Sequence, residues 1–123
     1  MDTEKLVRIK TGVVKRTHKE LLAYVQEEKD QRDRIELMKG SGQDVHDIKQ
    51  QQEVLNDTLN VLPDTMCRLQ KAHEDLADIL VDASMELGVP DEIAEGVELT
   101  EQQSLILDAR AALAAAEKVL PAE

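Results

Sequence analysis

The stretch Asn60–Leu69, NVLPDTMCRL, decides the fold, because it places Pro63 among leucine and methionine residues at helical spacing. A proline inside a helix removes one backbone hydrogen bond and clashes with the carbonyl four residues back, at a cost of about 3 kcal/mol. Either one helix ends at Pro63 and another begins, or a single helix runs through it with a bend. The phase of the surrounding apolar residues distinguishes these alternatives.

That phase is kept on both sides of Pro63, in steps of three and four residues that are typical of a helix packing in coiled-coil fashion. Two separate helices would have no reason to keep a common phase. The pattern therefore predicts one helix over about residues 44–87, bent at Pro63 and followed by Gly88 and Pro90. The residues at these steps form one row along the helix, which we call its seam. They are Val45, Ile48, Gln52, Leu55, Leu59, Leu62, Met66, Leu69, His73, Leu76, Leu80, Ala83 and Leu87.

A helix is expected on each side of this long one. The first covers about residues 3–39 and ends at the GSG sequence of residues 40–42, since glycine is common just past a helix end. The third covers about residues 100–120, after a connection over 88–99 with one helical turn, and TEQQ at its start has the spacing of a capping box. The seam of the first helix is Val7, Val14, Leu21, Val25 and Ile35, joined by His18, Glu28 and Arg32, and that of the third is Leu105, Ile106, Ala109, Leu113 and Ala116.

Short turns between helices make neighbours antiparallel. The expected fold is all-α: an elongated up-down-up bundle of three helices with coiled-coil-like packing, forming a single domain over residues 1–123. The short third helix should cover the first half of helix one and the last half of helix two. The GSG end is then a two-helix hairpin, where the polar seam residues Glu28, Arg32 and Gln52 gather and Arg32 lies opposite Gln52.

Composition limits the function. The 123 residues carry a net charge of −11 and one aromatic side chain, Tyr24, which argues against nucleic acid as a partner. The start of the chain has no apolar run of signal-peptide length, and nothing approaches the ~20 apolar residues of a membrane span. The single Cys67 fits a reducing compartment. We expect a cytoplasmic protein without membrane contact.

No pattern of residues indicates catalysis, a metal or a cofactor. His73 and Glu74 begin an HExxH motif, but Ala77 stands where the second histidine is needed. A packed, partly buried histidine is the preferred interpretation of His73, and of His18. Cys67 has no CxxC partner and is interpreted as a half-buried, unreactive thiol. The recurring carboxylates of the second helix are interpreted as a solvated face. An enzyme is therefore not expected.

Charge is unevenly distributed along the chain. Residues 1–20 hold six basic and three acidic side chains, net +3, whereas the remaining 103 residues hold nine and 23, net −14. This basic segment either solvates a helix face, helped by pairs such as Arg16 with Glu20, or contacts an acidic partner. Gly12 within it costs a helix about 1 kcal/mol relative to alanine, which close approach of another helix or of a partner would explain. The basic residues include Lys10, Lys15, Arg16 and Lys19.

Three motifs carry a resemblance to a known family. They are IKTGVVKR at residues 9–16, HDIKQQQEVL at 46–55 and LPDTMCRL at 62–69. Over about residues 5–80 the chain resembles tubulin-binding cofactor A, also called tubulin-folding cofactor A. The resemblance implies a three-helix bundle whose second helix bends at the proline.

The resemblance also implies a function. Members of this family are not enzymes; they capture β-tubulin released from the cytosolic chaperonin, hold it in a quasi-native state and pass it towards the α/β heterodimer. Other tubulin-folding cofactors are a second class of implied partner, and the location implied is the cytoplasm, in association with the cytoskeleton. Binding would use helix faces, and the residues expected to contact β-tubulin are Lys10, Lys15, Arg16, Lys19, Asp64 and Arg68.

The alternative is a structural coiled-coil adaptor or homodimerisation module without tubulin specificity. The same heptads would serve it, and the sequence is compatible with a monomer or a weak homodimer. A generic coiled coil has no need of the three motifs.

Overall fold

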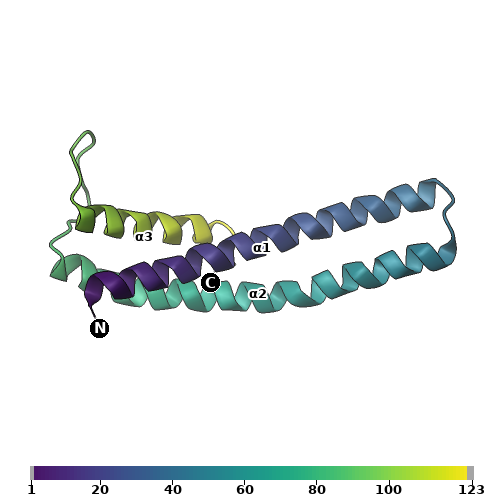
Figure 1. Ribbon diagram of the computed structural model, residues 1–123, viewed down its shortest axis with the longest axis horizontal. Coiled ribbons are helices and arrows are strands. Elements are labelled where there is room, and N and C mark those ends of the chain that lie inside the picture. Colours follow the sequence, from purple (N-terminus) through teal and green to yellow (C-terminus); the bar gives the residue numbers. More distant parts are fainter. Residues whose placement is uncertain (1, 122–123) are drawn as a thin grey trace. The chain divides into compact units, whose positions relative to one another are not determined.

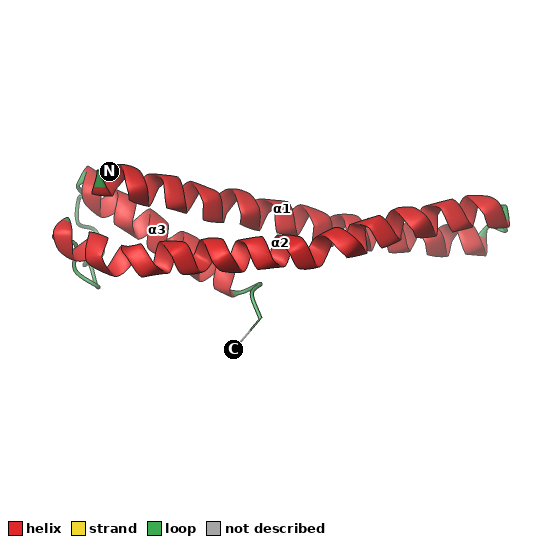
Figure 2. Cartoon of the chain, turned by 90° about the horizontal axis from the view of Figure 1, so that it is seen from below, coloured by secondary structure: helices red, strands yellow, loops and turns green. Residues whose placement is uncertain are grey.

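Three helices make up the computed structural model, which describes residues 2–121: α1 (Thr3–Gly40), α2 (Val45–Glu86) and α3 (Glu101–Glu117) (Figure 1). Residues 2–121 contain no strand (Figure 2), so the all-α prediction is confirmed. The helices pack in two units. Unit 1 comprises the chain up to His18 and from Arg68 onward, and unit 2 is Lys19–Cys67. The single domain expected over 1–123 stays a prediction.

Helix α2 passes through Pro63 without interruption, which confirms the single helix predicted from the phase of its seam. Pro63 is exposed, so its ring lies outside the core and the carbonyl four residues earlier can turn to water. Two threonines flank it: the Thr58 hydroxyl donates to the Val54 carbonyl at 3.4 Å, and the Thr65 hydroxyl to the Val61 carbonyl at 3.1 Å. Such bonds often bend helices, as proline does; the bend itself stays a prediction.

Polar side chains fix where α2 and α3 begin. The carboxylate of Asp44 accepts from the backbone N–H of His46 at 2.9 Å, which caps α2. The expected capping box of α3 is confirmed: the Thr100 hydroxyl accepts from the Gln103 N–H at 3.1 Å, while the Gln103 side chain accepts from the Thr100 N–H at 3.0 Å. The connection that precedes it differs from the prediction, because residues 88–99 form turns and contain no helical turn.

Glycines end the two long helices. Gly42 and Gly88 each adopt φ +68°, where a side chain would be strained. After Gly88, the Val89 N–H donates to the Ser84 carbonyl at 2.8 Å, the bond of a Schellman cap. That cap turns Val89 inward, where it is 5% exposed. Val89 was missed as a core residue because it follows the helix and so has no place in a helical seam.

The core of unit 1 is made by all three helices. Here α3 lies along the first part of α1 and the last part of α2 (Figure 1), as predicted from its length. Three buried alanines of α3 allow the helices to approach closely. Buried residues of this unit include Val7, Val14, Leu69, Leu76, Leu80, Ala83, Ile106, Ala109, Ala112 and Ala116.

Unit 2 is formed by α1 and α2 alone, and here the predicted seam was partly wrong. Val25 is 48% exposed and Arg32 is also exposed, while Gln31 is buried. Steps of three and four residues, continued from Leu21, lead to positions 24, 28, 31 and 35. The helical spacing therefore places Gln31 in the seam and leaves Val25 outside it, although valine is the more hydrophobic residue. Val45, also predicted to belong to the seam, is the first residue of α2 and is 76% exposed.

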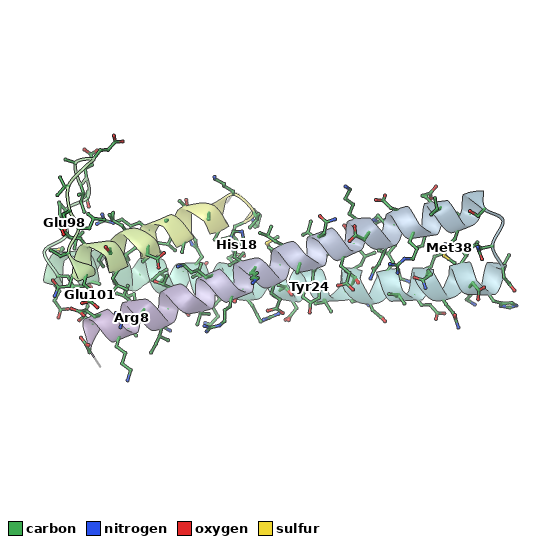
Figure 3. All side chains as sticks on the ribbon, turned by 45° about the horizontal axis from the view of Figure 1, so that its top comes forward. Arg8, His18, Tyr24, Met38, Glu98 and Glu101 are labelled. Atoms are coloured by element: carbon green, nitrogen blue, oxygen red, sulfur yellow. The ribbon has the colours of Figure 1, made fainter. Side chains whose placement is uncertain are left out.

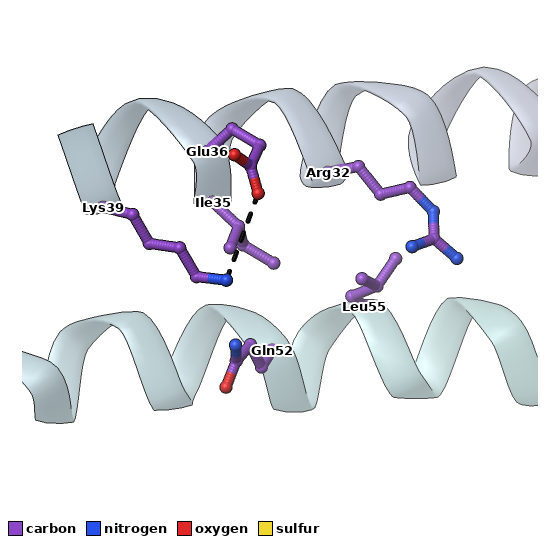
Figure 4. A pocket seen from close by; sticks show the side chains of 6 residues that line it. All are labelled: Arg32, Ile35, Glu36, Lys39, Gln52 and Leu55. Atoms are coloured by element: carbon purple, nitrogen blue, oxygen red, sulfur yellow. Dashed lines mark ion pairs between the residues drawn. The ribbon is translucent and has the colours of Figure 1, made fainter.

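Arg32 and Gln52 line one shallow pocket of unit 2, but they do not face each other directly as predicted: Arg32 extends towards Leu55, and Gln52 lies opposite Ile35 (Figure 4). Ile35 and Leu55 form its apolar floor. The Lys39 ammonium lies 4.0 Å from the carboxylate of Glu36, on the same helix. The two helices therefore bury few apolar groups here, and charged side chains shield the rest.

Replacing Gln31 by leucine is expected to stabilise the protein by about 1 kcal/mol. Its side chain is 5% exposed and its Nε2 donates to Glu27 at 3.1 Å, but its buried Oε1 has no partner. An apolar group of similar size removes that unpaired acceptor. Urea denaturation would measure the change.

Gln26→Leu is the matched control for this substitution. Gln26 makes the equivalent bond to Asp30, at 2.9 Å, but is exposed. Its replacement should change stability by less than about 0.5 kcal/mol. A loss of stability in Gln31→Leu alone would mean that the amide has a role in the seam beyond the Glu27 bond.

Candidate partner-binding surface

A row of basic side chains lies along the outer face of α1 in unit 1. Lys5, Arg8 and Arg16 are spaced so that they share one face, with Gly12 between them, and all three are exposed. Buried residues such as Val7 occupy the opposite face. Figure 3 shows Arg8 projecting away from the helices. We call Lys5, Arg8 and Arg16 the cationic stripe.

Two of the basic residues predicted to contact a partner are engaged within unit 1. The Lys15 ammonium donates to both carboxylate oxygens of Asp108 on α3, each at 2.7 Å. The Lys10 ammonium lies 4.0 Å from the carboxylate of Asp75 on α2. These pairs neutralise the two lysines and connect α1 to both neighbouring helices. The stripe therefore excludes Lys10 and Lys15.

The remaining predicted residues are distributed over both units. Arg16 and Arg68 belong to unit 1, and Lys19 and Asp64 to unit 2; all four are exposed. Lys5 and Arg8 were absent from the predicted set. The signal that would have found them is the helical spacing to Arg16, which places them on its face.

Within residues 2–121, no other helix comes within 4 Å of a side chain placed at Gly12. A Cβ placed there would meet the guanidinium of Arg16 at 3.1 Å, and otherwise only that same side chain within 4 Å. Of the two explanations for a glycine inside this helix, close approach of another helix is therefore unsupported. Approach of a partner to the stripe remains a hypothesis.

Within residues 2–121, no group of three or more histidine, cysteine, aspartate or glutamate side chains could hold a metal ion. The His73 ring nitrogen Nε2 lies 3.1 Å from the Glu117 carboxylate, and the side chain is 19% exposed. His18 is also partly buried, so both histidines are packed as predicted. Cys67 is exposed rather than half-buried. It directly follows the seam residue Met66 and therefore lies off the packed face of the helix.

No helix within residues 2–121 has the length and apolar character needed to cross a membrane. The fold and the surface thus define an all-α protein whose most distinctive surface is the cationic stripe of α1.

The model of one family, described as tubulin binding cofactor A, matches residues 2–120. The tubulin-specific chaperone A of Gallus gallus is 39% identical over 100 residues, which cover 81% of this chain and 86% of that protein. The tubulin-folding cofactor A of Arabidopsis thaliana is 36% identical over 108 residues, covering 88% and 91% of the two chains.

The crystal structure of tubulin folding cofactor A from Arabidopsis thaliana is similar, with a TM-score of 0.72 at 30% identity, covering 94% of this chain and 96% of that one. The human tubulin chaperone cofactor A has a TM-score of 0.71 at 31% identity, covering 94% and 99%. The chain belongs to the tubulin binding cofactor A family. The resemblance identified from the three motifs is thereby confirmed.

Proposed function

We propose that this protein is a tubulin-folding cofactor that captures β-tubulin after its release from the cytosolic chaperonin and holds it in a quasi-native state until the α/β heterodimer assembles. Family membership carries this proposal, because the relatives are named as tubulin-specific chaperones and tubulin-folding cofactors. The protein would act without catalysis, in the cytoplasm and in association with the cytoskeleton. It would also meet other tubulin-folding cofactors, and act as a monomer or weak homodimer.

The proposed contact is the cationic stripe of α1, with Lys19, Asp64 and Arg68 as further contacts. An acidic partner would be repelled by a net charge of −11, so a local patch of positive charge is what can orient its approach. Gly12 lies within the stripe, where the Arg16 guanidinium occupies the space beside it; a partner that draws Arg16 into an ion pair would reach the helix backbone at this position. Lys10 and Lys15 would support the contact indirectly, by holding α1 against its neighbours.

Capture of newly released β-tubulin, followed as a shifted band on a native gel with α-tubulin in a parallel lane, tests the proposal. We expect a complex with β-tubulin only. A complex with neither tubulin would refute the proposal and favour the coiled-coil adaptor. A complex with both would refute the specificity for β-tubulin.

Reversing two charges of the stripe, in Arg8→Glu with Arg16→Glu, is expected to weaken β-tubulin capture about tenfold at low salt and to reduce its dependence on salt. Both side chains are exposed, so the fold should be kept. Lys15→Glu would be a poorer test, because it would set two carboxylates against each other at Asp108. Titration at several salt concentrations would measure the effect.

The matched control for this variant reverses two exposed lysines of α2, in Lys49→Glu with Lys71→Glu. It alters the net charge by the same amount at other places. An equal loss of capture in both variants would mean that only net charge matters, and the stripe would then have no role as a site. Unchanged capture by the stripe variant would also remove it from the mechanism.

A further inference from the structure

A groove runs between α2 and α3 in unit 1, separate from the cationic stripe. One hollow, of about 620 Å³, has an apolar floor that includes Leu80, Val89 and Leu113. A second, of about 470 Å³, continues towards Leu120. Ala77 lines both, so the two hollows form one groove along α2.

Two large apolar side chains that line the groove are exposed. Val81 and Met85, one helical turn apart, line it and are 66% and 75% exposed. No described residue of unit 1 packs over them, whereas the other face of α2 is buried in the core. Methionine adapts its shape readily to a bound apolar group. This pair offers an apolar strip on which another helix could pack.

Carboxylates accompany the apolar strip. Glu74, Asp78 and Glu117 line one hollow, and Asp91 lines the other. The one arginine in the groove, Arg110, is held by its own unit: it donates to the Pro90 carbonyl at 2.9 Å and lies 3.4 Å from the Ser84 hydroxyl. The groove therefore combines an apolar floor with a negative rim.

We propose that this groove binds an amphipathic helix of another protein, with an apolar face that packs on Val81 and Met85 and with lysine or arginine residues on both flanks. Charge complementarity selects this partner, since a basic flank meets the carboxylates and an acidic one would be repelled. The stretch from Gln70 to Met85 is about 22 Å long, the length of about four helical turns. The bound helix would complete a four-helix arrangement around α2 and α3.

A second copy of this chain fits the groove poorly. Its basic helix face carries Gly12 between Arg8 and Arg16, where an apolar side chain would be needed to fill the groove. Helix α1 therefore does not present an exposed apolar side chain between its basic residues, as the proposed partner helix must. The occupant is a different protein, and the groove and the stripe can be occupied together because they belong to different helices.

The test uses the full chain and a fluorescent 15-residue peptide of leucine, alanine and lysine, with leucines at helical spacing and lysines on both flanks. A scrambled peptide of the same composition has the same charge but no apolar face. We expect fluorescence anisotropy to show saturable binding of the amphipathic peptide, with a Kd about tenfold lower than that of the scrambled one. Equal binding of the two peptides would reduce the effect to net charge and overturn the proposal.

Variants locate the binding. Met85→Ser with Val81→Ser should raise the Kd about tenfold, and Glu74→Gln with Asp78→Asn should weaken binding and reduce its salt dependence. Leu37→Ser is the matched control, because Leu37 is as exposed as Met85, at 74%, but lies in unit 2. An equal loss in this control would refute the groove as the site.

Two further measurements decide the identity of the occupant. If sedimentation detects a dimer that the Met85 and Val81 variant abolishes, the occupant is a second copy and the proposal is wrong. If that variant also loses β-tubulin capture, the groove belongs to the tubulin interface instead. Retained capture with lost peptide binding is the expected result.

Discussion

Replacing Leu76 by alanine is expected to lower the free energy of unfolding by about 2–5 kcal/mol, the range found for buried leucines. Leu76 is 0% exposed in the core of unit 1, where α1, α2 and α3 meet. The substitution removes apolar contacts and leaves a cavity that three packed helices can fill only in part. Urea denaturation monitored by circular dichroism would measure the loss.

Leu37→Ala makes the same chemical change on a long helix at a site that is 74% exposed, and should alter stability by less than about 0.5 kcal/mol. The same experiment tests the expectation of a single domain, which predicts that all helices unfold in one transition. Two transitions, of which Leu76→Ala shifts only one, would show that the two units unfold separately.

Replacing Pro63 by alanine is expected to raise the free energy of unfolding, by up to about 3 kcal/mol. Alanine restores the backbone N–H that can donate to the carbonyl of residue 59, and it removes the clash of the ring with that carbonyl. Pro63 is exposed, so no core contact is lost in exchange. The melting temperature should rise accordingly. Pro90→Ala is the control: Pro90 lies outside the helices, so no helical hydrogen bond is gained.

A sharp fall in stability on Pro63→Ala would mean that the packing of unit 2 depends on a bend in α2. Capture of β-tubulin by this variant separates two roles of the proline. Raised stability with unchanged capture would make Pro63 a local feature of the helix. Raised stability with weakened capture would mean that the proline shapes the binding face.

Most of the helical structure could be predicted from the spacing of the apolar residues and from the capping motifs. An unbroken 3,4 spacing across Pro63 was sufficient to predict α2 as one helix, because apolar phase is a property of consecutive turns. The capping box at Thr100 was equally readable, since its two bonds join residues three apart. Family membership followed from three short motifs, which need no knowledge of packing.

Tertiary structure decided two features: which residues form the seam in unit 2, and which basic residues of α1 form ion pairs with other helices. Gln31 is buried and Val25 exposed because the helix phase and the facing helix determine orientation, whatever the polarity of the side chain. Lys15 forms an ion pair with Asp108 of α3, 93 residues away in the chain, which the sequence did not indicate. No local pattern encodes such a pairing.

The sequence by itself therefore determined the class of fold, the start and end of each helix to within a few residues, and the family. The tertiary structure alone decided which charges of α1 are exposed, and that Val81 and Met85 line a groove. The physical reason is the range of the interactions: helical periodicity and caps act over three to seven residues, whereas burial and ion pairs between helices depend on which distant segments meet.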